Sequence, residues 1–140
     1  MPYASSVSVL CGKNVAKKIV SLPNILDARI KKRSDGLFRI YWPWILWEPD
    51  SYDVIRKMDR TIKSFAEKRI ADDADDDFCS FIRIGEDSGD IEQIRNNDCM
   101  ERQWVGSYID AGCEDTAVKC GGSDFATKEF AMLMFKKGEW

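Results

Sequence analysis

The chain has 140 residues and 44% hydrophobic content, enough to bury the core of one domain, which excludes a disordered chain. It carries 21 basic and 24 acidic residues, a net charge of −3, and no histidine. The absence of histidine excludes the usual catalytic triads and zinc hydrolase sites, and no apolar run reaches the roughly 20 residues of a membrane span.

The first 47 residues predict a strand, a short helix and a hairpin. Residues 5–11 alternate polar and apolar side chains, which is typical of a strand, and residues 12–21 group their apolar side chains on one side of a helix. Strands at 25–33 and 37–47 follow, joined by a turn that ends at Gly36. Pro43 has no N–H group to donate, so it indicates an edge or a bulge in the second of these strands.

The next segment predicts a long helix and a further strand. Apolar residues recur at steps of three and four over residues 51–70, with Asp50 or Ser51 as the N-cap, and residues 78–84 alternate as a strand. The resulting order, β-α-β-β-α-β, is that of a ferredoxin-like layer. We therefore predict one α+β domain over 1–140, with a ferredoxin-like core at 5–84 and a mixed extension at 85–140.

The extension is less regular. Ser88 or Asp90 is expected to cap a short helix that runs through Ile94, and residues 100–109 alternate as a strand. Residues 123–137 predict either a terminal helix, capped by Ser123 or Asp124, or a buried strand.

Five cysteines are present, and no pair has the C-x-x-C spacing of a zinc or redox motif. They are Cys11, Cys79, Cys99, Cys113 and Cys120. The odd count, with no signal peptide at the start of the chain, predicts a cytoplasmic protein whose cysteines are small core residues. We predict no metal and no cofactor.

Charge is divided unevenly along the chain. Residues 1–71 carry a net charge of +7 and residues 72–140 a net charge of −10. Such asymmetry indicates a surface used for association, although two solvated faces that differ, or pairing of charges inside the fold, would explain it too.

The acidic residues that follow the long helix form the leading candidate site. These are Asp72, Asp73, Asp75, Asp76, Asp77, Glu86, Asp87, Asp90 and Glu92. A calcium loop that opens at Asp72 would need glycine at Asp77 and glutamate at Arg83, so the spacing excludes an EF-hand. Carboxylates gathered on one side of the molecule would imitate a phosphate backbone. This favours a stoichiometric inhibitor or immunity-type protein that binds a basic protein, such as a nucleic-acid-binding enzyme.

The basic first half, which includes the exposed side of the long helix, supports an alternative. Aromatic residues interleave with these bases in strand 37–47, where Tyr41, Trp44, Trp47 and Glu48 would form the site. They predict a module that binds single-stranded nucleic acid or an organic cation. The same aromatic side chains would equally serve as core or as a homodimer interface.

No enzyme motif is present. Gly12-Lys13 lacks the remainder of a phosphate-binding loop, and no cysteine has a histidine to activate it. We therefore predict a protein without enzymatic activity. Small size, a mixed α+β pattern and divided charge are also traits of many phage-encoded inhibitors and toxin-immunity proteins, but no motif carries that resemblance.

Overall fold

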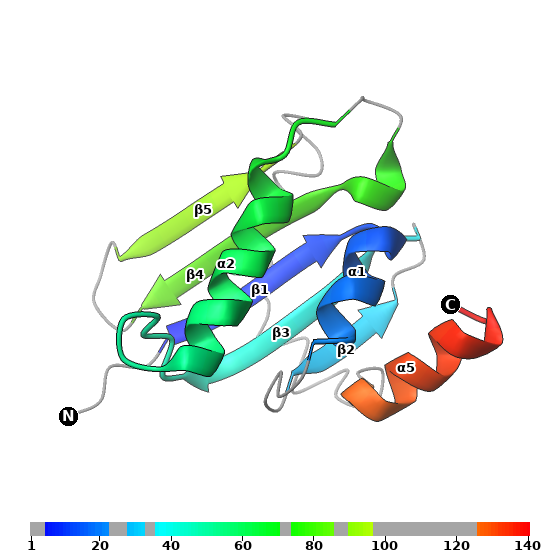
Figure 1. Ribbon diagram of the computed structural model, residues 1–140, viewed down its shortest axis with the longest axis horizontal. Coiled ribbons are helices and arrows are strands. Elements are labelled where there is room, and N and C mark those ends of the chain that lie inside the picture. The colour runs from blue at the N-terminus through cyan, green and yellow to red at the C-terminus, as the bar shows by residue number, and fades with distance from the viewer. Residues whose placement is uncertain (1–4, 23–27, 33–35, 71–73, 86–89, 97–125) are drawn as a thin grey trace.

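The computed structural model describes residues 5–22, 28–32, 36–70, 74–85, 90–96 and 126–140. Within them the strands are β1 (Ser5–Cys11), β2 (Arg29–Lys32), β3 (Phe38–Ile45), β4 (Cys79–Gly85) and β5 (Ile91–Arg95). The helices are α1 (Lys13–Val20), α2 (Asp53–Glu67), α5 (Lys128–Lys137) and the short 3-10 turn η1 (Asp75–Asp77). All strand pairs are antiparallel and form one sheet in the order β2-β3-β1-β4-β5 (Figure 1). The predicted α+β class is confirmed.

Strand β1 lies at the centre of the sheet, between β3 and β4. Val7, Val9 and Cys11 belong to the main core cluster. Ser8 and Leu10, which point to the opposite face, are buried as well, at 3% and 2% exposure. The alternation of serine with apolar residues therefore does not mark a solvent-facing side, because both faces of this central strand are covered.

Helices α1 and α2 lie side by side across one face of the sheet, which we call the helix-covered face (Figure 1). In α2 the buried Ile55, Met58 and Ile62 are spaced so that they share one side of the helix. The helix expected over 51–70 is confirmed. The expected cap is wrong, however, because Tyr52 occupies the N-cap position and makes no side-chain capping bond.

A β-bulge interrupts β3. Trp42 lies opposite Val7 of β1 and Ile45 lies opposite Ser5, so three steps along β3 match two steps along β1. This confirms the irregularity expected at Pro43. An unbroken alternation along residues 37–47 predicts Trp47 on the same side as Tyr41. The prediction is wrong, because the extra residue reverses the alternation and directs Trp47 to the helix-covered face.

Strand β5 replaces the short helix that the sequence predicts through Ile94. Residues Ile84 to Ser80 of β4 pair with Ile91 to Arg95, so this segment extends the sheet beside β4. Isoleucines three residues apart suit a helix, yet here the backbone bonds to the neighbouring strand decide the structure. The sheet is therefore larger than the four strands of the predicted core.

The C-terminal segment is a helix, which decides between the two structures expected for residues 123–137. Thr127 is its N-cap and accepts a hydrogen bond from the Phe130 N–H at 3.2 Å, whereas Ser123 and Asp124 lie outside the described residues. Phe135 and Trp140 place their rings 5.2 and 5.8 Å from that of Phe38, which attaches α5 beside the β2 edge (Figure 1). The strand expected at 100–109 also lies outside the described residues.

Candidate functional site

The structure describes five of the nine predicted acidic site residues. Asp72, Asp73, Glu86 and Asp87 lie outside the described residues. Asp75, Asp76 and Asp77 form η1 at one end of β4, and all three are exposed. Of these, Asp77 accepts a hydrogen bond from the Asn14 side chain of α1 at 3.0 Å.

The other two described acids, Asp90 and Glu92, are held by basic side chains. Arg83 donates from two nitrogens to the two carboxylate oxygens of Asp90, at 2.8 and 3.2 Å. Lys63 of α2 donates to Glu92 at 3.1 Å, and the Arg83 guanidinium lies 3.5 Å from the same carboxylate. These two carboxylates are thus largely neutralised, one of them by a lysine of the basic first half.

The pKa values of the two bases reflect this pairing. The hydrogen bond to Asp90 raises the pKa of Arg83 and outweighs its partial burial. Burial lowers the pKa of Lys63, but hydrogen bonds to Glu92 and Asp59 outweigh it, so the pKa lies above its ordinary value. We call Asp59, Lys63, Arg83, Asp90 and Glu92 the charge network; it joins α2, β4 and β5.

The predicted aromatic site is not assembled. Tyr41 is 1% exposed and lies on the sheet face away from α1 and α2. Trp47 is 5% exposed on the helix-covered face, where its indole N–H donates to the Asp59 carboxylate at 3.1 Å. Glu48 follows it and is half-buried, and the side chain of Trp44 lies outside the described part. Since Tyr41 and Trp47 are buried on opposite faces, they cannot enclose one ligand.

A group of exposed bases lies instead on the two helices and directly after the end of α2. We call it the basic helical surface, and it consists of Lys17, Lys18, Lys57, Arg60, Lys68 and Arg69. In α1 the buried side is occupied by Val15, Ala16, Ile19 and Val20, so the lysines are left outside. In α2 the same partition leaves Lys57 and Arg60 opposite the apolar side.

The bases of the two helices form one surface. The Lys18 ammonium lies 5.4 Å from the centre of the Phe65 ring, which brings α1 against α2 within this layer. In the part of the chain that the structure describes, none of the six bases takes part in an ion pair. The nearby Asp53 is engaged by Arg56 at 2.9 Å, which leaves Glu67 as an exposed acid beside them.

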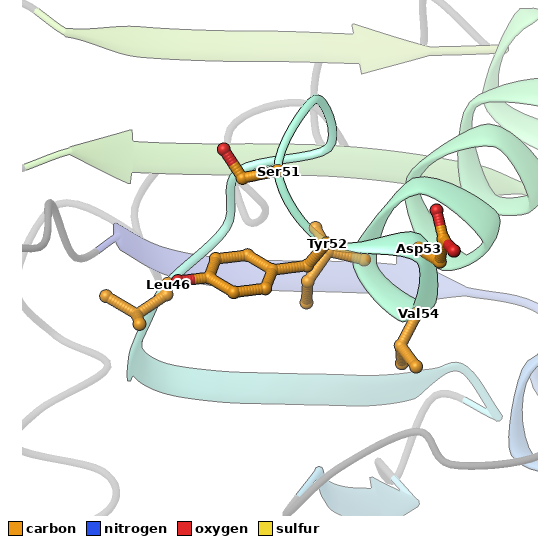
Figure 2. A pocket seen from close by; sticks show the side chains of 6 residues that line it. Leu46, Ser51, Tyr52, Asp53 and Val54 are labelled. Carbon is orange, nitrogen blue, oxygen red and sulfur yellow. The ribbon is translucent and has the colours of Figure 1, made fainter.

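A shallow pocket of about 580 Å³ opens at the start of α2. Figure 2 shows the ring of Tyr52 pointing toward Leu46, with Val54 on the other side of Tyr52; Ser51 and Asp53 also contribute to the lining. No sequence motif marks this pocket, because Tyr52 and Leu46 come together only where the chain turns from β3 into α2. Its wall is mainly apolar, and it contains no pair of groups arranged for acid–base chemistry.

Among the described residues, no group of three or more cysteine, aspartate or glutamate side chains is arranged to hold a metal ion. The helices described here are also too short or too polar to cross a bilayer. Comparison of the chain with known protein families, with characterised proteins and with solved structures found no match.

Proposed function

We propose that this protein is a non-enzymatic binding module whose basic helical surface binds the phosphate backbone of nucleic acid. The observation that carries the proposal is the exposure of six lysine and arginine side chains, four on two adjacent helices and two directly after the second helix, without an ion pair to any described residue. Bases of this kind release counterions when they meet phosphates, which favours binding at low salt.

The proposal does not include recognition of base sequence. Tyr41, Trp42 and Trp47 are buried, so they are unable to stack on bases. Backbone contacts alone bind many sequences with similar affinity. The module therefore resembles the predicted alternative in its ligand class, but uses helices instead of the aromatic strand.

Charge reversal on the helices tests this function. We expect Lys17→Glu, Lys57→Glu and Arg60→Glu together to weaken binding to a fluorescent oligonucleotide at least about 30-fold at low salt, in fluorescence anisotropy titrations. Single-stranded and double-stranded oligonucleotides are titrated separately.

The matched control is Lys136→Glu with Lys137→Glu on α5, because these lysines are exposed and lie outside the basic helical surface. We expect the control to bind within a few-fold of the unmodified chain. Equal loss in both variants, or no binding by the unmodified chain, contradicts the proposal.

A second candidate function rests on η1. We propose that Asp75, Asp76 and Asp77 contact a basic protein, as a stoichiometric inhibitor that imitates nucleic acid would. Three exposed carboxylates within one turn support this reading, and Asp90 and Glu92 do not contribute because basic side chains hold them.

The two functions are separated by an affinity capture from the source cell in low and high salt, with the Asp75→Asn, Asp76→Asn variant in parallel. Inhibitor function requires a basic protein that salt releases and that the variant fails to capture. The control is Glu129→Gln with Glu139→Gln, which removes two exposed acids in α5 and directly after it. Capture that is unaffected by the η1 variant argues against this candidate.

We also propose that β1 to β4 with α1 and α2 form a ferredoxin-like core to which β5 adds an edge strand. The chain order of these elements and the neighbours β2-β3-β1-β4 support it. An experimental structure in which β1 is not flanked by β3 and β4 would contradict this assignment.

A further inference from the structure

Two free cysteines lie opposite each other on the adjacent strands β1 and β4. Cys11 ends β1 and Cys79 begins β4, and the register of these antiparallel strands makes them direct cross-strand partners. Both side chains are fully buried, and both belong to the core cluster on the helix-covered face. Cys11 and Cys79 are far apart in the sequence, so no sequence motif indicates the pair.

The backbone hydrogen bonds show whether Cys11 and Cys79 occupy a hydrogen-bonded or a non-hydrogen-bonded position of the β1–β4 pair. The neighbouring Gly12 N–H donates to the Phe78 carbonyl at 2.9 Å, so the 12/78 position is where β1 and β4 bond to each other. The Cys79 N–H and carbonyl instead bond to Asn96, at 2.9 and 3.1 Å. Bonded and non-bonded positions alternate along an antiparallel pair, so Cys11 and Cys79 occupy a non-bonded position.

Non-bonded positions bring side chains closest together. Their Cα atoms lie about 4.5 Å apart in antiparallel sheets, which is within the range of roughly 4.4 to 6.8 Å found for disulfides. Both side chains also point to the same face. A bond between the two sulfur atoms therefore requires rotation of side chains and no displacement of the strands.

We propose that Cys11 and Cys79 are a modification site, at which a small-molecule disulfide oxidant converts the two thiols into an intrachain disulfide. The thiolate of one cysteine attacks the oxidant, forms a mixed disulfide and releases one small thiol. The second cysteine, as its thiolate, attacks the mixed disulfide at the protein sulfur and releases the second small thiol. The two cysteines lose two electrons and two protons, and the oxidant gains them.

The reaction depends on access to the thiols. Burial raises the pKa of Cys79 to about 12 and holds the pKa of Cys11 well above its ordinary value. Since the thiolate is the attacking species, the folded dithiol reacts slowly. The mixed disulfide forms while the thiols are exposed, during folding or in an opened state. The second thiolate attacks it as β1 and β4 come together, and the closed sheet then protects the disulfide from reduction.

Peptide mapping tests the site directly. The full chain is unfolded under reducing conditions, refolded in a glutathione buffer rich in the oxidised form, alkylated and digested with trypsin. Cleavage after Lys13, Arg69 and Arg83 places the two cysteines in peptides 1–13 and 70–83. We expect these peptides to be recovered as one disulfide-linked species. Recovery of both as separately alkylated peptides, or of either one linked to another cysteine, overturns the proposal.

Two further measurements, of melting temperature and of oxidation rate, test the same pair. A chain with Cys99, Cys113 and Cys120 changed to serine has only the proposed pair, and it is expected to form the same linked species and to melt about 10 °C higher when oxidised. Adding Cys79→Ala to that chain abolishes the shift. The folded, reduced chain is expected to oxidise at least about 10-fold more slowly than the refolding chain; equal rates overturn the dependence on opening.

Discussion

Gly12 lies where β1 ends and α1 begins, with its backbone against η1. A Cβ atom at this position would overlap the carbonyl oxygen of Asp75 and the backbone of Asp76. The φ angle of Gly12 is −80°, which any residue adopts, so the close approach of another backbone is what requires glycine here. The close packing of η1 against the start of α1 therefore requires a residue without a Cβ atom at position 12.

We predict that Gly12→Ala lowers the free energy of unfolding by about 2 to 3 kcal/mol, because backbone cannot move aside as a flexible side chain can. Urea denaturation measures the change. The comparison variant is Gly36→Ala, where φ is +87° and nothing lies within 4 Å of the added atom, so only the backbone conformation costs about 1 kcal/mol. Equal losses of unfolding free energy in the two variants would show that η1 moves to accommodate the added Cβ atom at little cost.

The buried thiols predict how stability changes with pH in reducing buffer. Burial raises the pKa of Cys79 from its ordinary 9.0 to about 12, and that of Cys11 rises as well. Between these values the unfolded chain loses thiol protons that the folded chain keeps, so stability falls as pH rises.

We expect the free energy of unfolding to fall between pH 9 and 10.5 with a slope approaching about 1.4 kcal/mol per pH unit for each thiol. Urea titrations at several pH values measure the slope. The Cys11→Ala, Cys79→Ala variant is less stable throughout but is expected to lose most of this slope. Lys63 has a raised pKa and adds its own loss only above about pH 10.5, so a slope retained by the variant below that pH contradicts the assignment.

At the scale of elements, the charge network attaches β5 to α2. The Lys63 ammonium forms ion pairs with two carboxylates, that of Asp59 on its own helix at 3.2 Å and that of Glu92 on β5 at 3.1 Å. It also lies 5.7 Å from the centre of the Phe81 ring. Glu92 lies on a different element from Lys63, so their contact exists because β5 pairs with β4.

We predict that Glu92→Gln lowers the free energy of unfolding by about 1 kcal/mol, since the pair is partly exposed and water screens it. Glu67→Gln on the exposed side of α2 is the control and is expected to change stability by less than about 0.5 kcal/mol. A double-mutant cycle with Lys63→Met isolates the pair. Zero coupling in that cycle would mean that the Lys63–Glu92 pair contributes nothing to the attachment of β5 to α2.

At the scale of the whole molecule, opposite charges are partly interleaved and partly separated. Asp90 and Glu92 are held by Arg83 and Lys63, whereas η1 and the basic helical surface remain exposed. The acidic hypothesis required the later carboxylates to gather on an exposed surface, and among the described acids of the predicted site the three aspartates of η1 are exposed, whereas Asp90 and Glu92 are partly buried in ion pairs. This is why the helices now provide the better-supported surface.

We expect the affinity for a single-stranded oligonucleotide to fall with salt, with a slope of log K against log salt no steeper than about −4, because at most six bases meet phosphates. The Lys17→Glu, Lys57→Glu, Arg60→Glu variant should reduce that slope by about 2. Anisotropy titrations over 20 to 200 mM salt, roughly the range where such effects are large, measure both slopes. A slope unchanged by the variant would place the contact elsewhere.

The α+β class and the existence of β1, α1, β3, α2 and β4 could be predicted from the amino-acid sequence. The periods of 2 and 3.6 residues arise from the backbone of each segment, so a local pattern is enough to recognise them. The core side of α2 and the exposure of its bases follow from the same period.

Four features could not be predicted from the sequence: strand β5, the direction of Trp47, the ion pairs of Asp90 and Glu92, and the cross-strand position of Cys11 and Cys79. Each depends on which strand becomes the neighbour of which, or on a bulge that shifts the alternation by one residue. Such contacts join residues that are distant in the chain, and periodicity within one segment carries no information about them.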